Sequence, residues 1–101
     1  MEGRSAAIYG DSGASSFNGV IDMYIQVTVD LQNYTGEVFD LQISNYLSVK
    51  KVIEIVWQVK KIEERPKEGY WIRVQNKELV CPGYDSLVDA GITTGDRVEV
   101  L

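Results

Sequence analysis

The sequence predicts an α+β fold, a small sheet with one main helix packed on one of its faces. Two observations predict it. Apolar and polar residues alternate in two early runs, which is typical of half-buried strands, and one later segment repeats its apolar residues every three or four positions, which is typical of an amphipathic helix. A hairpin, a crossover helix and strands that return beside the hairpin form a roll with one covered sheet face.

The first two strands are expected to form an antiparallel hairpin. Between them, the segment "QNYTG" places Asn33 and Gly36 in a turn, where both residues tolerate a positive φ. The apolar positions of the two runs are Met23, Ile25, Val27 and Val29, followed by Phe39, Leu41 and Ile43.

The main helix is expected over about residues 48–61. Ser48 is a favourable N-cap residue, and Pro66 disfavours helical backbone at Arg65. Its apolar stripe comprises Val49, Val52, Ile53, Val56 and Val59. Because β-branched residues are poor helix formers, burial against a sheet has to stabilise this helix.

Two further strands are expected after the helix. The third strand should bury Ile72 and Val74, and the last, Arg97 to Leu101, should bury its two valines. Between these strands, "CPGYDS" is interpreted as a loop, and "SLVD" as a single helical turn capped by Ser86.

Composition narrows the possible functions. A chain of 101 residues has the length of one domain, and a net charge of −5 disfavours nucleic-acid binding. The chain has no histidine, the commonest general base and zinc ligand, and its single cysteine, Cys81, allows no intramolecular disulfide. No apolar run approaches the roughly 20 residues that span a bilayer. We therefore expect a soluble, cytoplasmic protein that is no enzyme, uses no cofactor or metal and does not insert into membranes.

The chain is expected to divide into a leader and one folded domain. Residues 1–22 are rich in Gly, Ser and Ala without periodicity, which predicts a flexible leader. Its "EGR" resembles the remnant of a protease-site linker added for expression. Residues 23–101 carry the periodic patterns and form the domain.

Residues 23–101 resemble ubiquitin in the order of their elements and in "SLVDAGITTGDRVEVL". The segments "FDLQISNYLSVKKVIEIVWQ", "WIRVQNKELV" and "DAGITTGDRVEVL" are most similar to the YukD/EsaB family, small ubiquitin-like proteins encoded with type VII secretion systems of Gram-positive bacteria. This resemblance implies a ubiquitin-like β-grasp roll with a mixed sheet of four to five strands. It also implies an accessory or regulatory component that binds membrane or ATPase components of the secretion machine.

The sequence departs from ubiquitin at two points. Conjugation and sulfur transfer need a flexible diglycine tail, whereas the sequence ends on Leu101 within the expected last strand. A conjugated modifier or sulfur carrier is therefore the disfavoured alternative, and a domain of a larger eukaryotic protein is a weaker one. Arg73 stands where ubiquitin has the central isoleucine of its recognition patch, so standard ubiquitin receptors should not bind here.

The outward positions of the sheet supply the candidate partner-binding residues. Tryptophan beside arginine is typical of an interface hot spot, although Trp71 could instead pack on the hairpin or on lysine stems. The candidates are Tyr24, Trp71, Arg73, Arg97 and Leu101. Trp57 is expected to pack beneath the segment "ERPKEGY". The edge strand from Phe39 to Ile43 leaves the oligomeric state open.

Two other features predict no chemistry. Cys81 has no histidine to form a thiolate and is interpreted as a packing residue. Four carboxylates late in the chain fit no calcium loop, and two of them, Asp89 and Asp96, are expected to act as cap and turn residues. The four are Asp85, Asp89, Asp96 and Glu99.

Overall fold

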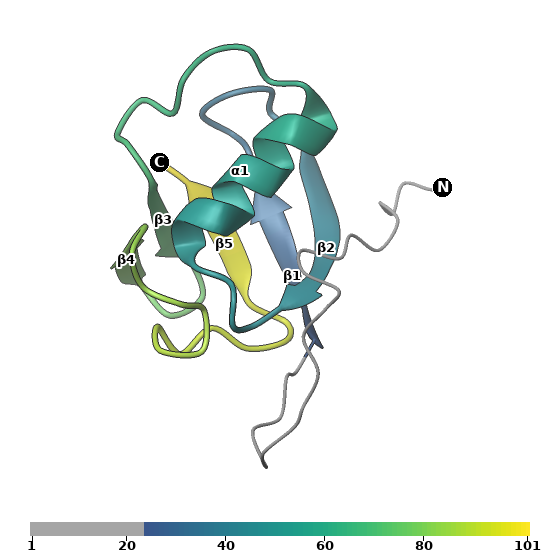
Figure 1. Cartoon of the computed structure of the whole chain (residues 1–101). Coiled ribbons are helices and arrows are strands. Elements are labelled where there is room, and N and C mark those ends of the chain that lie inside the picture. The colour runs from purple at the N-terminus through teal and green to yellow at the C-terminus, as the bar shows by residue number, and fades with distance from the viewer. Residues whose placement is uncertain (1–23) are drawn as a thin grey trace.

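The computed structural model describes residues 24–101, so Met23 and the predicted leader, residues 1–22, lie outside the described part. The described chain forms five strands and one helix (Figure 1). Their bounds are β1 Tyr24–Asp30, β2 Val38–Ser44, α1 Val49–Lys60, β3 Trp71–Val74, β4 Leu79–Pro82 and β5 Arg97–Val100.

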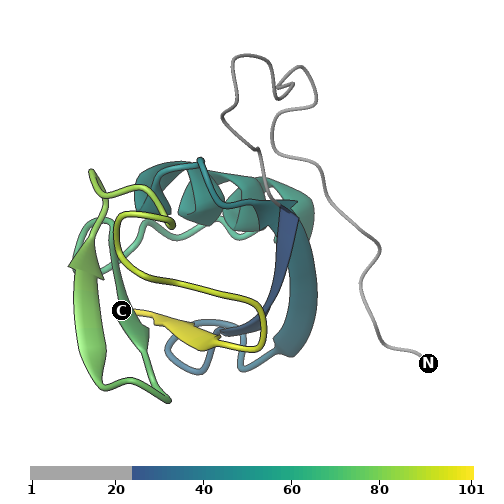
Figure 2. The same cartoon turned by 90° about the horizontal axis from the view of Figure 1, so that it is seen from below.

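The strands form one mixed sheet in the order β2-β1-β5-β3-β4. The hairpin pairs Tyr24 with Ser44 at one end and Asp30 with Val38 at the other. β5 lies parallel to β1 and antiparallel to β3, which pairs in turn with β4. Figure 2 shows α1 covering one face of the curved sheet, with β5 between β1 and β3. The predicted ubiquitin-like β-grasp fold is confirmed.

The core lies between α1 and the inner face of the sheet. The apolar residues predicted to face inward in the four expected strands are all buried where the structure describes them. In the helix the stripe is buried from Val49 to Val56, but Val59 is 45% exposed. At this end of the core, Trp57 and Ile62 pack against the buried residues instead.

The ends of α1 are set by local backbone contacts. The Ser48 hydroxyl accepts a hydrogen bond from the Lys51 amide at 3.0 Å, which confirms the predicted N-cap. The helix ends before Pro66 exerts any effect, because Lys61 adopts a left-handed conformation with φ of 55°. The Lys61 amide then donates to the Trp57 carbonyl, a common way of closing a helix.

The interpretation of the segment "CPGYDS" as a loop was partly wrong. Cys81 and Pro82 belong to β4, where they lie opposite Ile72 and Trp71. Proline is tolerated at this position because β4 is an edge strand. A backbone N–H that points away from β3 has no neighbouring strand of the described sheet to donate to, so its absence in Pro82 breaks no pairing. After β4, Ser86 caps a turn rather than a helix, and its hydroxyl accepts from the Asp89 amide at 3.1 Å.

Candidate functional site

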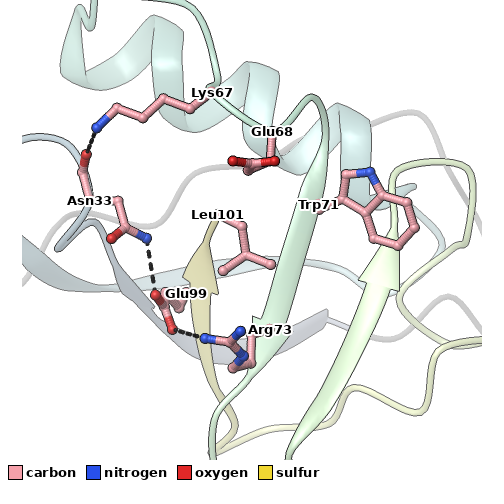
Figure 3. A pocket seen from close by; sticks show the side chains of 7 residues that line it. All are labelled: Asn33, Lys67, Glu68, Trp71, Arg73, Glu99 and Leu101. Atoms are coloured by element: carbon pink, nitrogen blue, oxygen red, sulfur yellow. Dashed lines mark hydrogen bonds and ion pairs between the residues drawn. The ribbon is translucent and has the colours of Figure 1, made fainter.

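An open groove of about 580 Å³ lies where β3 begins and β5 ends (Figure 3). It brings together three of the five predicted partner-binding residues, Trp71, Arg73 and Leu101. The dashed contacts in Figure 3 run along one side of the groove, and the Trp71 ring stands on the other. The remaining lining residues are Asn33, Lys67, Glu68 and Glu99.

Leu101 is held in the groove by its backbone. Its amide donates to the Trp71 carbonyl at 3.0 Å, extending the pairing of β5 with β3 beyond Val100. Its carbonyl accepts from the Tyr34 hydroxyl at 3.2 Å, and that hydroxyl accepts from the Lys67 amide at 2.7 Å. Tyr34 therefore ties the end of β5 to the segment that precedes β3.

Arg73 is oriented by a buried carboxylate. Its Nη1 lies 3.3 Å from Oε1 of Glu99, whose residue is only 5% exposed, while the Arg73 side chain is about half exposed. The Arg73 side chain also lines the groove. Glu99 therefore belongs to the candidate site because it contacts Arg73, whereas the sequence analysis considered it only among four carboxylates that fit no calcium loop.

Glu99 is ionised because polar contacts outweigh its burial. Burial raises the pKa of Glu99, but hydrogen bonds from Gln32, Gln75 and Asn33 and the charge of Arg73 lower it, and the net shift is downward. The amide nitrogens of Asn33 and Gln75 lie 3.0 and 3.2 Å from its carboxylate oxygens. Charge-assisted hydrogen bonds of this kind stabilise the carboxylate form.

Arg97 lies beside the groove without lining it. Its Nη2 is 3.0 Å from Oδ2 of Asp30, a buried residue on β1. Gln75 contacts both Asp30 and Glu99, at 3.4 and 3.2 Å, and so connects Arg97 to the Glu99–Arg73 pair. The predicted residues Arg73 and Arg97 thus belong to one polar network on the exposed sheet face.

Tyr24 is not brought together with the other candidates. Thr28, four residues later in β1, lies opposite Arg97, the first residue of β5. Because the two strands are parallel, Tyr24 and Leu101 lie at opposite ends of the sheet, about 25 Å apart along the strands at 3.3 Å per residue. The outward positions of the sheet supplied all five candidates, but this distance places Tyr24 outside the groove that Trp71 and Leu101 line.

The two tryptophans differ in their contacts. Trp57 donates its indole N–H to the Glu64 carbonyl at 2.8 Å and contacts the Tyr34 ring edge-on, with ring centroids 4.8 Å apart. The prediction that Trp57 packs beneath the segment "ERPKEGY", which begins at Glu64, is confirmed. Trp71 is 41% exposed, and its indole N–H has no hydrogen-bond partner within residues 24–101.

The surroundings of Cys81 and Asp96 indicate structural roles for both residues. Burial, and to a smaller extent the charge of Asp85, raises the pKa of the Cys81 thiol, so it is protonated at neutral pH. Asp96 accepts from the Thr93 amide at 2.9 Å, which confirms its predicted role in the turn before β5. Among the residues described, no cluster of three potential metal ligands occurs, and no helix is long and apolar enough to cross a membrane.

Comparison with known proteins gives two matches. The family model described as "WXG100 protein secretion system (Wss), protein YukD" matches residues 24–100. A protein of Bacillus subtilis strain 168 named "ESX secretion system protein YukD" is 54% identical over 79 residues, which cover 78% of this chain and 100% of that relative. The family match spans all five strands and the helix.

Proposed function

The chain belongs to the YukD family of the WXG100 protein secretion system, and on that premise we propose that it is a non-enzymatic interaction module of a bacterial type VII secretion machine. It acts in the cytoplasm and binds membrane or ATPase components of the machine through the groove at the ends of β3 and β5. The observation that carries the proposal is the exposed Trp71 beside Arg73, whose guanidinium is held by the buried Glu99.

The chemistry of this groove favours a protein partner. Tryptophan and arginine are the residues most enriched in interface hot spots, and an arginine already held in place loses less side-chain entropy on binding. Lys67 and Arg73 are balanced in the groove by Glu68 and Glu99, so net charge alone does not select the partner. We expect a partner carboxylate on the free donors of Arg73 and an apolar side chain against Trp71 and Leu101.

The backbone contacts of Leu101 hold the end of β5 in paired structure. At Leu101 both the amide and the carbonyl are hydrogen-bonded, to Trp71 and Tyr34 respectively. Freeing this residue would break both contacts. The alternative, a protein modifier or sulfur carrier, predicts adducts of higher mass in extracts of the native host, which intact-mass measurement would detect.

The proposal is tested by pull-down with the purified cytoplasmic parts of the membrane and ATPase components. Trp71→Ala and Arg73→Glu should each weaken capture at least tenfold, since they remove a hot-spot side chain and reverse a charge. Val59→Ala is the matched control, because Val59 is 45% exposed but lies on the helix. Full capture by both groove variants would refute this docking surface. Tyr24→Ala and Arg97→Glu report whether the two remaining candidates contribute.

A further inference from the structure

A second groove, of about 450 Å³, opens next to the first and shares only Trp71 with it. Three aromatic side chains line it: Tyr70 and Trp71 at the start of β3, and Tyr84 in the loop after β4, which is 86% exposed. Lys50, Pro82 and Gly83 also line it. None of these residues except Trp71 contributes to the groove proposed above for docking.

Backbone contacts hold this groove in shape. A side chain at position 83 would place its Cβ 2.7 Å from Cβ and 2.9 Å from the carbonyl oxygen of Tyr70, so only glycine allows this close approach. The Gly83 carbonyl accepts from the Lys50 amide at 2.9 Å, which fixes the loop to the first turn of α1. Pro82, just before it, lies opposite Trp71 in the sheet.

The groove presents hydrogen-bond donors that no other residue in the described part of the chain uses. Within residues 24–101, neither the indole N–H of Trp71 nor the hydroxyls of Tyr70 and Tyr84 have a hydrogen-bond partner. Lys50 Nζ lies 5.2 Å from the centroid of the Tyr70 ring, and no carboxylate in the described chain lies within ion-pair distance of it. The groove thus offers aromatic faces, free donors and one unpaired positive charge.

We propose that this groove binds a proline-rich segment in the polyproline II conformation, with an acidic residue next to the prolines. Polyproline II helices have no internal hydrogen bonds, so their carbonyls are free to accept from the indole and phenol groups. Proline rings pack on aromatic faces, and the preformed helix loses little entropy on binding. The unpaired charge of Lys50 selects an acidic flank over a basic one.

Two other modes of peptide binding fit this groove less well. An added strand would have to pair with the edge of β4, but Pro82, which lines the groove, has no N–H to donate. An amphipathic helix uses its own carbonyls internally, so it would bury the free donors of Trp71 and Tyr84 without partners. A polyproline II segment meets neither difficulty.

The test is a titration of the 15N-labelled full chain with a peptide of prolines ending in two glutamates, followed by NMR. The indole signal of Trp71 and the amide signals of Lys50 and Tyr84 should shift on binding. The indole signal of Trp57 is an internal control, because its N–H already donates to the Glu64 carbonyl. A glycine–serine peptide with the same two glutamates is the comparison peptide, and shifts of equal size with it would overturn the proposal.

Two variants test peptide binding in this groove independently of the first groove. Tyr84→Ala should lower peptide affinity at least tenfold, since it removes an exposed aromatic face without touching the first groove. Lys50→Glu should reverse the charge preference, so that a proline peptide ending in two lysines binds more tightly than the glutamate peptide. Val59→Ala, at a residue that is 45% exposed on the helix and lines neither groove, should change nothing. Unchanged affinity in the Tyr84 variant would refute the assignment.

Discussion

Replacing Tyr34 by phenylalanine tests how the end of β5 is held. The substitution removes one oxygen atom and keeps the ring that contacts Trp57 and lies 5.0 Å from Lys67 Nζ. Two hydrogen bonds are lost: the hydroxyl no longer donates to the Leu101 carbonyl or accepts from the Lys67 amide. Any change in stability therefore reports these two contacts rather than packing.

The expected loss follows from the surroundings of each contact. A typical intramolecular hydrogen bond contributes about 1 kcal/mol net, and more when a group is left buried without a partner. The Lys67 amide is exposed and can bond to water, whereas the Leu101 carbonyl is partly buried. We expect the free energy of unfolding to fall by about 1–2 kcal/mol. With a urea m-value of about 1–1.5 kcal/mol/M for a domain of this size, the midpoint should fall by about 1 M.

The assay is urea unfolding of Tyr34→Phe and of Tyr84→Phe as a matched control. Both variants lose one phenol hydroxyl, but that of Tyr84 has no partner in the described chain, so its variant should match the parent. Amide hydrogen exchange at Leu101 should also accelerate in the Tyr34 variant, because only one of its two backbone contacts remains. Equal midpoints for the two variants would refute the claim that Tyr34 anchors Leu101.

Three further predictions concern stability. Burial raises the folded-state pKa values of Glu99 and Asp96, but hydrogen bonds and neighbouring cations lower them by more. The net shift of both pKa values is therefore downward. At a pH above their unfolded-state pKa values of about 4, the two ionised carboxylates therefore stabilise the fold. This stabilisation is lost as the pH falls through their folded-state pKa values. Urea midpoints should decrease between pH 5 and pH 2, and Glu99→Gln should flatten this decrease; an unchanged slope would contradict the assignment. Lys61→Gly should raise the free energy of unfolding by about 0.5–1 kcal/mol, because Lys61 has a φ of 55°, which glycine adopts with less strain; a lower midpoint would refute this reading of the helix end. Gly83→Ala should destabilise the fold by at least about 1 kcal/mol, since the new methyl would overlap the Tyr70 backbone, and a thermal melt equal to that of the parent would show that the loop yields.

Part of the site could be predicted because it depends on alternation along one strand. Trp71 and Arg73 were assigned to the outer face from their spacing with Ile72, and both are exposed there. The role of Glu99 could not be assigned in this way. It lies opposite Arg73 in the sheet, and that pairing depends on the register between two strands separated by more than twenty residues. The distance of Tyr24 from the groove likewise follows from the parallel register of β1 and β5.

The sequence by itself determined the elements whose stabilisation is local. The alternation of β1, β2, β3 and β5, the stripe of α1 and the Ser48 cap all depend on residues within a few positions of one another. Tertiary structure alone decided that Pro82 continues an edge strand, that Glu99 is buried and ionised, and that Tyr70, Trp71 and Tyr84 surround one groove. Those outcomes arise from contacts between segments far apart in the chain, and no local periodicity encodes such contacts.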